Sequence, residues 1–229
     1  MFERIQKLYT IDEFERIQNL NILLIGVGGV GGYALESLVR SGIKNITVID
    51  YDQFEITNMN RQILCTKESL GMSKVEVALQ RAKRINQGIQ IKGLNQKLTK
   101  EDINREFLLK FDIVIDACDD VSLKTALFIE CTNNKVRIIS CMGTGNRFHP
   151  ELLEIIPLKN TQNDPLAKKL RHELRNHKEA LNIPVVCSKE LPIKGIGLGT
   201  CCPLPMAAGA LLASYVIKKE KLPSPKADI

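Results

Sequence analysis

The chain has 229 residues, of which 44% are hydrophobic and 25% are charged, and its formal net charge is +6. This composition is ordinary for a globular protein and excludes the disordered and fibrous classes, while the length predicts one domain over residues 1–229. The positive charge favours anionic partners such as nucleotides or RNA, although it carries no information about the fold.

Strands and helices alternate along the first 142 residues. Five short apolar runs predict strands buried on both faces, at 21–26, 45–50, 89–94, 111–117 and 136–142. Helical patterns are found at 30–42, 73–86, 100–110 and 122–134. Because this alternation requires crossover connections, we predict an α/β fold with a Rossmann-like, doubly wound and mainly parallel sheet.

After residue 142 the alternation breaks, which predicts a C-terminal extension. We expect residues 143–160 to be extended and irregular. A basic helix is predicted over 164–178, with Asp164 as its cap and Pro165 in its first turn. A strand over 183–188 and a final helix over 203–221 follow, and the last residues are expected to fray.

The cysteines, the N-terminus and the apolar runs predict the cellular location of the protein. Seven cysteines at irregular spacings, without a Cys-x-x-Cys pair, predict reduced thiols and argue against a four-cysteine zinc site. The chain opens with the charged run MFERIQK instead of a secretory pattern, so we expect a cytoplasmic protein. The apolar run 204–217 is shorter than the ~20 residues that a membrane-spanning helix needs, so no membrane association is expected.

A glycine run, GVGGVG, lies between the first predicted strand and the first predicted helix. Its glycines Gly26, Gly28, Gly29 and Gly31 allow the backbone to approach phosphates, and the helix N-terminus supplies free amide donors. Asp50 ends the second strand, where a carboxylate accepts hydrogen bonds from ribose hydroxyls. By itself this motif favours an NAD-dependent oxidoreductase.

The polar loop after Asp50 favours ATP instead. Asn58 and Gln62 carry amides, and the guanidinium of Arg61 suits a forked grip on phosphate oxygens. Lys74 begins the next helix, from which it reaches back towards the same phosphates. For each residue taken singly, the alternative is a solvated surface group.

Two carboxylates follow the fourth predicted strand, at the sheet edge where ligands bind in such folds. Asp116 and Asp119 supply the oxygen ligands that magnesium shares with phosphates. The alternative is that Asp119 or Asp120 caps the next helix.

In this order, the Gly-x-Gly-Gly-x-Gly, Asp-x-Asp, Asn-x-x-Arg-Gln, lysine and Asp-x-x-Asp signals resemble the ThiF-type adenylating family, which activates ubiquitin-like proteins and sulfur carriers. The resemblance covers residues 2–217. It implies that Asp50 holds the ribose of ATP, that Asn58, Arg61 and Lys74 hold the phosphates, and that Asp119 coordinates magnesium.

The resemblance also implies a homodimer. The family carries an arginine near its N-terminus that crosses the dimer to the partner's ATP, and Arg4 occupies that place. The alternative is an exposed helix arginine. Thr10 stands where the family commonly has glycine, and His149 stands where it more often has aspartate.

The C-terminal third resembles the branch of the family that dehydrates threonylcarbamoyladenosine in tRNA to its cyclic form. The matching segments are NTQNDPLAKKLRHELR and LGTCCPLPMAAGALLASYVI. The resemblance implies that the substrate carboxylate attacks the α-phosphate of ATP and releases pyrophosphate. The carbamoyl group then closes the acyl adenylate, and AMP leaves. Whether a sulfur-relay protein assists is left open.

The predicted basic helix is the candidate tRNA contact. Lys168, Lys169, Arg171 and Arg175 lie in it, and Lys168, Arg171 and Arg175 are spaced to share one face. Such a face suits RNA phosphates, although a charge run is often only a solvated surface.

Protein-activating relatives pass their cargo to a cysteine. Cys187 and Cys118 are candidates here, but we expect both to be buried and inert, and no catalytic cysteine is assigned.

Three other functions are considered. An adenylyltransferase for a ubiquitin-like sulfur carrier would use the same ATP site, but members of that class usually carry zinc-binding cysteine pairs, which are absent here. The others are a nucleotide sensor without turnover and an NAD oxidoreductase.

Overall fold

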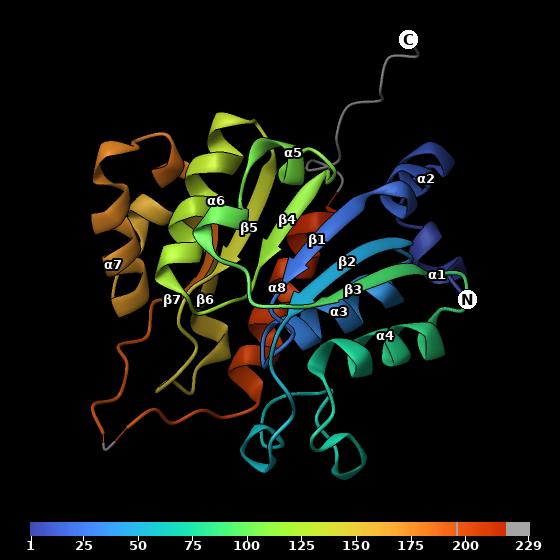
Figure 1. Ribbon diagram of the computed structural model, residues 1–229, viewed down its shortest axis with the longest axis horizontal. Helices are drawn as coiled ribbons and strands as arrows, with labels where there is room; N and C mark the ends of the chain where they lie inside the picture. The colour runs from blue at the N-terminus through green and yellow to red at the C-terminus, as the bar shows by residue number, and fades with distance from the viewer. Residues whose placement is uncertain (196, 219–229) are drawn as a thin grey trace.

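The computed structural model describes residues 1–195 and 197–218, and their central feature is one seven-stranded sheet (Figure 1). The strand order is β3-β2-β1-β4-β5-β7-β6, so the chain winds outwards in both directions from β1. The strands are β1 Asn21–Ile25, β2 Asn45–Asp50, β3 Gln90–Asn95, β4 Ile113–Asp116, β5 Arg137–Cys141, β6 Leu153–Pro157 and β7 Pro184–Ser188. The predicted doubly wound α/β fold is confirmed.

All neighbouring strands run parallel except β6, which pairs antiparallel with β7. The predicted strand at 183–188 therefore joins the main sheet as β7. The segment 143–160 was expected to be extended and irregular; it is extended over Leu153–Pro157, but these residues form the regular strand β6. The Leu153–Pro157 run has the antiparallel register Leu153↔Ser188 to Pro157↔Pro184, which closes the sheet on that side.

Helices cover both faces of the sheet (Figure 1). One face carries α3, α4 and α8, and the other carries α5, α6 and α7, while the short N-terminal helices lie beside the first strands. The helices are α1 Glu3–Gln6, α2 Ile11–Asn19, α3 Gly31–Arg40, α4 Lys74–Ile85, α5 Arg105–Leu108, α6 Val121–Asn133, α7 Pro165–Glu173 and α8 Pro203–Ile217. Among these described helices, none is both long and apolar enough to cross a bilayer.

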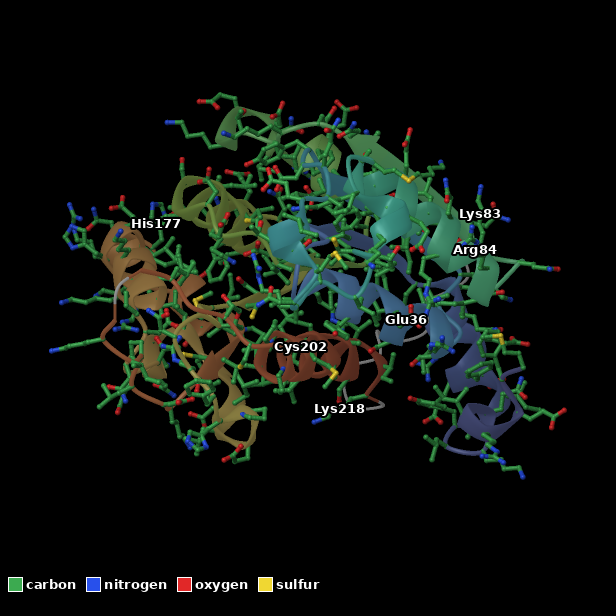
Figure 2. The ribbon with its side chains drawn as sticks, turned by 90° about the horizontal axis from the view of Figure 1, so that it is seen from below. Glu36, Lys83, Arg84, His177, Cys202 and Lys218 are labelled. Atoms are coloured by element: carbon green, nitrogen blue, oxygen red, sulfur yellow. The ribbon has the colours of Figure 1, made fainter. Side chains whose placement is uncertain are left out.

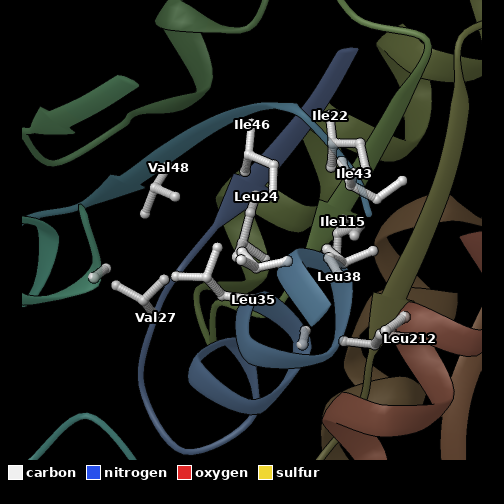
Figure 3. Close-up of a cluster of buried hydrophobic side chains, with 14 of the residues drawn as sticks. Ile22, Leu24, Val27, Leu35, Leu38, Ile43, Ile46, Val48, Ile115 and Leu212 are labelled. Atoms are coloured by element: carbon white, nitrogen blue, oxygen red, sulfur yellow. The ribbon is translucent and has the colours of Figure 1, made fainter. Parts of the chain in front are cut away.

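The core consists of two apolar layers, one on each face of the sheet. Successive side chains of a strand point to opposite faces, so Leu24 packs under α3 whereas Leu23 packs under α6. Figure 3 shows the first layer, with Leu35 and Leu38 of α3 lying over the strand side chains. Burial on both faces explains why the strands read as continuous apolar runs.

Two predicted helices differ from the structure. The helix expected over 100–110 forms only α5, because the Asn104 side chain accepts a hydrogen bond from the Phe107 amide and starts a new helix there. The basic helix expected over 164–178 ends at Glu173, and residues Leu174–Asn176 form a 3-10 turn. The predicted final helix is α8, and residues 219–221 and the tail lie outside the described residues.

Gly209 sets the distance between α8 and α3. A Cβ atom at this position would lie 2.5 Å from the Val30 carbonyl oxygen and 2.9 Å from the Ala34 amide nitrogen. Since Val30 belongs to the glycine loop that precedes α3, the packing of α8 reaches the candidate site.

We therefore expect Gly209→Val to destabilise the protein by about 1–3 kcal/mol through overpacking, and to weaken nucleotide binding because the glycine loop shifts. Urea unfolding and calorimetric titration with ATP measure the two effects. Gly195→Ala is the control, since a Cβ there meets no atom within 4 Å. Equal stability of the two variants would show that α8 does not constrain α3.

Candidate functional site

A cleft of about 720 Å³ lies at the carboxyl ends of β1, β2, β4 and β5. This is the switch point of a doubly wound sheet, where the connections leave in opposite directions and ligands bind. Of the residues that the sequence singled out for ATP and magnesium, the cleft is lined by Gly26, Gly28, Gly29, Asp50, Asn58, Arg61, Gln62, Lys74 and Asp119. The fold therefore brings together side chains from five separate segments.

The glycine loop is compact because two of its positions exclude a side chain. Gly26 has a φ of +85°, and a Cβ there would lie 2.9 Å from the Ala117 carbonyl oxygen. A Cβ on Gly31 would lie 1.8 Å from the Gly26 carbonyl oxygen, so this predicted site residue closes the loop from behind instead of lining the cleft. Gly28 and Gly29 border the cleft and leave room for a ligand.

Asp50 joins the second strand to this loop. Its Oδ2 accepts a hydrogen bond of 2.8 Å from the Val27 amide, and its Oδ1 accepts one of 3.0 Å from the Asp52 amide. The side chain is buried, at 9% exposure. Asp50 thus shapes the loop itself and lines the cleft, and its contact with a ribose stays a prediction.

Arg61 is held by one side of its guanidinium. Nη1 donates to the Thr57 carbonyl oxygen at 2.8 Å and to Asn60 Oδ1 at 2.9 Å. Asn60 in turn donates to the Thr200 carbonyl oxygen, which joins this loop to the segment before α8. Nε and Nη2 of Arg61 make no hydrogen bond within the described residues and remain for a ligand in the cleft.

Two amide side chains lie beside Arg61. Asn58 Oδ1 accepts a hydrogen bond from the Glu55 amide, so the side-chain oxygen shapes the loop and the NH₂ group is left over. Gln62 is 6% exposed, and its buried Oε1 has no hydrogen-bond partner within the described residues. A buried unpaired polar atom is costly, so a ligand that donates to Gln62 would relieve that cost.

Lys74 begins α4 and is 6% exposed, with its ammonium 2.8 Å from Asp52 Oδ2. The sequence pointed to Lys74 but not to Asp52 as its partner. Because the Asp52 side chain is 47% exposed, this ion pair is weakly stabilising, and a polyphosphate with several charges can compete for the ammonium.

The acidic cluster after β4 separates into three roles. Asp120 caps α6 by accepting a hydrogen bond from the Leu123 amide, so the helix cap that was the alternative interpretation of Asp119 or Asp120 is formed by Asp120. Asp116 is fully buried and paired with Lys124, so it is not available to a metal. Asp119 is exposed at the cleft and makes no hydrogen bond or ion pair within the described residues, which leaves its oxygens for a cation.

Lys124, which lies beneath the cleft, was not identified from the sequence. Its ammonium donates to Asp116 Oδ2 at 2.7 Å, Ser140 Oγ at 2.9 Å and the Cys141 carbonyl oxygen at 2.9 Å, so all three of its protons are used. Burial is the largest single influence and lowers the Lys124 pKa, but the charge of Asp116, its hydrogen bond and the smaller contributions of Cys118 and Cys141 together raise it. The network ties the ends of β4 and β5 together beneath the cleft. The only signal in the sequence is a lysine in an otherwise apolar helix face.

Cys118 lines the cleft, where its thiol is hydrogen-bonded. Its thiol donates to Asp116 Oδ1 at 3.0 Å. Burial, and then the charge of Asp116, raise the Cys118 pKa well above its usual value. The raised pKa favours the expected inert thiol, but Cys118 is half-buried instead of fully buried as expected.

Cys187 in β7 is more deeply buried than Cys118. It is 2% exposed, and burial followed by the charge of Asp164 raises its pKa to about 12. At pH 8 we therefore expect Cys187 to resist alkylation by iodoacetamide in the folded protein and to react in urea. Peptide mass spectrometry after short labelling measures this, with Cys131, whose pKa is also about 12, as a second buried thiol. Rapid labelling of native Cys187 would contradict this and reopen a covalent role.

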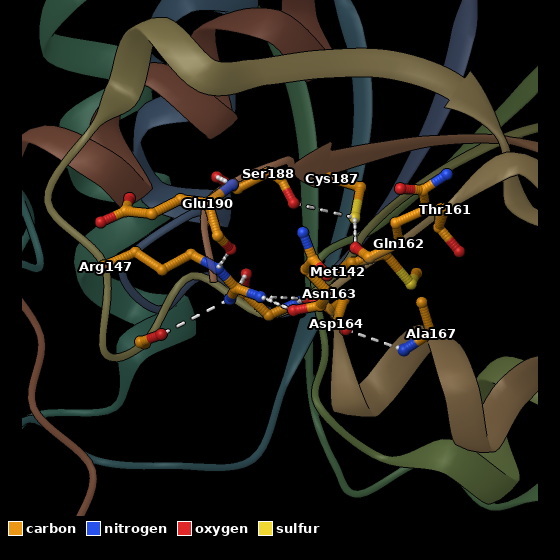
Figure 4. A network of polar contacts seen from close by, with 12 residues as sticks. Met142, Arg147, Thr161, Gln162, Asn163, Asp164, Ala167, Cys187, Ser188 and Glu190 are labelled. Atoms are coloured by element: carbon orange, nitrogen blue, oxygen red, sulfur yellow. Dashed lines mark hydrogen bonds and ion pairs between the residues drawn. The ribbon is translucent and has the colours of Figure 1, made fainter. Parts of the chain in front are cut away.

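A buried ion pair shapes the far side of the cleft (Figure 4). Arg147 and Asp164 are 3.2 Å apart and almost fully buried. Arg147 also donates to the carbonyl oxygens of Gly143 and Asn163, while Asp164 accepts from the Gly143 amide and caps α7 at the Ala167 amide. The predicted cap is confirmed, and the pair fixes the loop after β5 against the start of α7.

The basic segment does not present the single face that was expected. Lys168 and Lys169 are exposed on α7, but Arg171 is half-buried and donates to the Thr161 hydroxyl. Arg175 lies beyond the helix end, in the 3-10 turn, with its guanidinium 3.2 Å from His172 Nε2. Figure 2 shows this segment at the outer edge of the molecule, with His177 close to its end. Two lysines thus remain as exposed candidates on the helix itself.

Arg4 lies away from the cleft of its own chain. It is exposed on α1, which packs through Phe2 against the Phe14 ring of α2, with ring centroids 6.4 Å apart. Phe2 and Phe14 also surround Gly42, where α3 has ended and before β2 begins, at the opposite edge of the sheet. Arg4 does not line the cleft of its own chain.

The two departures noted in the sequence have local structural roles. Thr10 caps α2: its hydroxyl accepts from the Glu13 amide, and the Glu13 carboxylate accepts from the Thr10 amide at 2.7 Å. His149 is exposed, and its Nδ1 lies 2.8 Å from Glu151 Oε1. This contact with Glu151 raises the pKa of His149. Neither residue lines the cleft.

The doubly wound sheet, the glycine loop at its switch point, and Arg61 and Lys74 at the same cleft define a nucleotide-binding α/β protein with a site suited to a polyphosphate. The model of the ThiF family matches residues 3–219. The chain belongs to the ThiF family.

Similar proteins come from several bacteria. The tRNA threonylcarbamoyladenosine dehydratase of Escherichia coli strain K12 is 32% identical over 209 residues, covering 88% of this chain and 78% of that protein. The dehydratase of the same name from Haemophilus influenzae is 37% identical, covering 76% and 67%. A crystal structure of the Escherichia coli enzyme in complex with ATP superposes with a TM-score of 0.90 at 32% identity, covering 95% of this chain and 92% of that chain.

Proposed function

We propose that this protein uses ATP to dehydrate threonylcarbamoyladenosine in tRNA to its cyclic form. The observation that carries the proposal is the single cleft that holds the glycine loop, Arg61, Lys74 and Asp119, in a fold that superposes along 95% of the chain on an ATP-bound dehydratase. The similar proteins of highest coverage share this activity by name, which favours it over activation of a sulfur carrier.

The reaction consists of two steps. A carboxylate oxygen of the threonyl group attacks the α-phosphorus of ATP, and pyrophosphate leaves with the electrons of the broken bond. The carbamoyl group then attacks the activated acyl carbon, gives up its N–H proton to the solvent and displaces AMP. The oxygen lost from the carboxylate departs in AMP, so the nucleoside loses one water overall.

The protein's part is to orient the groups and to stabilise negative charge. Arg61, with one side of its guanidinium free, and Lys74 line the same cleft as Gly28 and Gly29, and in this proposal they bind the phosphates. Preorganised donors of this kind stabilise charge that develops on phosphoryl oxygens, and no covalent enzyme intermediate is required. Asp50 accepts from the ribose, and Asn58 and Gln62 contribute their amides.

Magnesium fits the acidic end of the cleft. The carboxylate oxygens of Asp119 are free there of any partner in the described part of the chain. The negative charge at this end also raises the pKa of the exposed Tyr51 phenol, mainly through Asp52 and to a smaller extent through groups that include Asp119. Within the described residues no group of three His, Cys, Asp or Glu side chains could hold a metal. Asp119 would therefore hold the ion together with phosphate oxygens, and the bound ion would neutralise phosphate charge.

The assembly is also part of the proposal. The protein acts as a cytoplasmic homodimer in which Arg4 reaches the partner's nucleotide, since Arg4 is remote from its own cleft. Lys168 and Lys169, with Arg175 beside them, contact tRNA phosphates. Arg171 contributes through its contact with Thr161, which positions the segment. A sulfur-relay protein would be a further partner of this assembly.

The test is mass spectrometry of tRNA nucleosides after incubation of tRNA bearing the modification with protein, ATP and magnesium. We expect the threonylcarbamoyladenosine mass to decrease by that of one water, with AMP and pyrophosphate formed in equal amounts. Release of pyrophosphate with a ubiquitin-like carrier protein, and an unchanged nucleoside mass, would instead establish the adenylyltransferase alternative.

A further inference from the structure

The cleft has a second half that the nucleotide-binding residues leave free. Gly26, Asp50, Arg61 and Lys74 belong to the half after β1 and β2. The other half lies after β5 and is bordered by the loop from Met142 to Gly145 and by the first turn of α7. Only β4 lies between β1 and β5, so the two halves are two strand spacings apart, ~10 Å, and a nucleoside with a long side chain can span that distance to a phosphate above the glycine loop.

The second half is uncharged and largely apolar. Met142, Leu166 and Leu198 line it, and Thr144 adds a hydroxyl. Arg147 and Asp164, which fix the loop after β5, are buried and paired with each other, so they offer nothing to a ligand. A neutral, flat group fits these walls better than another phosphate does.

Leu198 is the most exposed apolar side chain at this place. It is 82% exposed, yet it borders the cleft and lies against Gly145, where a Cβ would be 2.4 Å from its Cδ1. Its loop is attached to the end of β5 by Asn146, whose Oδ1 accepts from the Gly199 amide and whose backbone amide donates to the Gly199 carbonyl oxygen. The loop thus holds an apolar side chain at the mouth of the second half.

Basic side chains lie beside the opening of this second half to the solvent. Leu166 lines the cleft from the first turn of α7, and Lys168 and Lys169 are exposed just beyond it on the same helix. A nucleotide whose base enters beside Leu166 therefore has its flanking phosphates near these lysines. Enzymes that act on a base take it out of the stack and hold it against apolar walls in this manner.

We propose that this second half of the cleft, between the loop after β5 and the N-terminal turn of α7, receives the modified adenosine turned out of the tRNA, with Leu166 and Leu198 as the apolar walls for its base. The inference rests on the proposed function and adds the location and the chemistry of the acceptor site. The carboxylate of the nucleoside then points along the cleft towards the α-phosphate of ATP.

The test compares two exposed leucines of one loop in steady-state dehydration of tRNA. We expect Leu198→Asp to raise the KM for tRNA by about tenfold or more, with the KM for ATP within twofold of the parent protein. Leu198→Phe retains an apolar wall and is expected to keep the parent KM. Leu191→Asp is the matched control, because Leu191 is 70% exposed but does not line the cleft.

Salt dependence separates the base site from the phosphate contacts. The double variant Lys168→Ala, Lys169→Ala is expected to reduce the salt slope of tRNA binding by about one for each lysine, whereas Leu198→Asp leaves the slope unchanged. If Leu198→Asp keeps the parent KM for tRNA, or raises the KM for ATP equally, the base site is elsewhere. If the parent protein does not dehydrate tRNA at all, the proposed function fails and the acceptor site fails with it.

Discussion

Replacement of Arg61 by alanine is expected to lower the rate of ATP-dependent pyrophosphate release by about 10²–10³-fold, which is the range for loss of one preorganised donor at a developing charge. The guanidinium is oriented by Thr57 and Asn60 before a ligand arrives, so little reorganisation is needed at the moment of reaction. Single-turnover assays with tRNA and labelled ATP measure the effect on the adenylation step directly.

The shape of the guanidinium, and not only its charge, should matter at this position. Arg61→Lys keeps the charge but loses the fork, so we expect it to recover only part of the lost rate. Arg84→Ala is the control, because Arg84 is an exposed residue of α4 that does not line the cleft (Figure 2). An Arg61→Ala variant as active as Arg84→Ala would remove Arg61 from the proposed mechanism.

Replacement of Lys124 by methionine should produce the largest loss of stability of any single change considered, about 3–5 kcal/mol, because it leaves the buried Asp116 carboxylate without its cation. The side chains of Lys124 and Asp116 have no exposed surface. The substitution also removes the hydrogen bonds from the ammonium to Ser140 and Cys141. Chemical unfolding followed by circular dichroism measures the difference in the free energy of unfolding.

The control removes both charges together. The double variant Lys124→Met, Asp116→Asn should be more stable than Lys124→Met alone, because a neutral buried amide costs less than an unpaired carboxylate. Equal stability of the single and double variants would show that the ion pair is not what holds β4 to β5. The pKa of Lys124 is raised in the folded protein. The stability that this shift contributes is therefore fully present below the unfolded-state pKa of lysine and is lost only as the pH rises through the folded-state pKa. Measurements near pH 7 therefore record the full effect.

Local patterns predicted the fold correctly where burial and spacing leave little freedom. The five apolar runs became β1 to β5 and the glycine run became the loop before α3, because a strand buried on both faces and a loop without side chains have clear signatures. The same reasoning failed where a local signal interrupts a pattern. The Asn104 cap cut short the helix expected over 100–110, and β6 formed in a segment that lacks the earlier alternation.

The candidate site was predictable in part. Arg61, Lys74 and Asp119 were identified because each follows a strand or a polar loop at the edge of the sheet where ligands bind. Asp52, Lys124 and Arg147 were not, since their importance depends on partners that are distant in the sequence or have no spacing rule. Arg171 was assigned to a free basic face, but its contact with Thr161 depends on how α7 packs.

The amino-acid sequence by itself determined the alternation of strands and helices, the glycine loop and the set of charged side chains that approach one cleft, because hydrophobic periodicity and glycine at crowded positions are local properties. Only the tertiary structure decided which of these charges are free. Asp116 and Arg147 are neutralised in buried pairs, whereas Asp119 and one side of Arg61 remain available. The reason is physical: a buried charge requires a partner, and that partner comes from another segment of the folded chain.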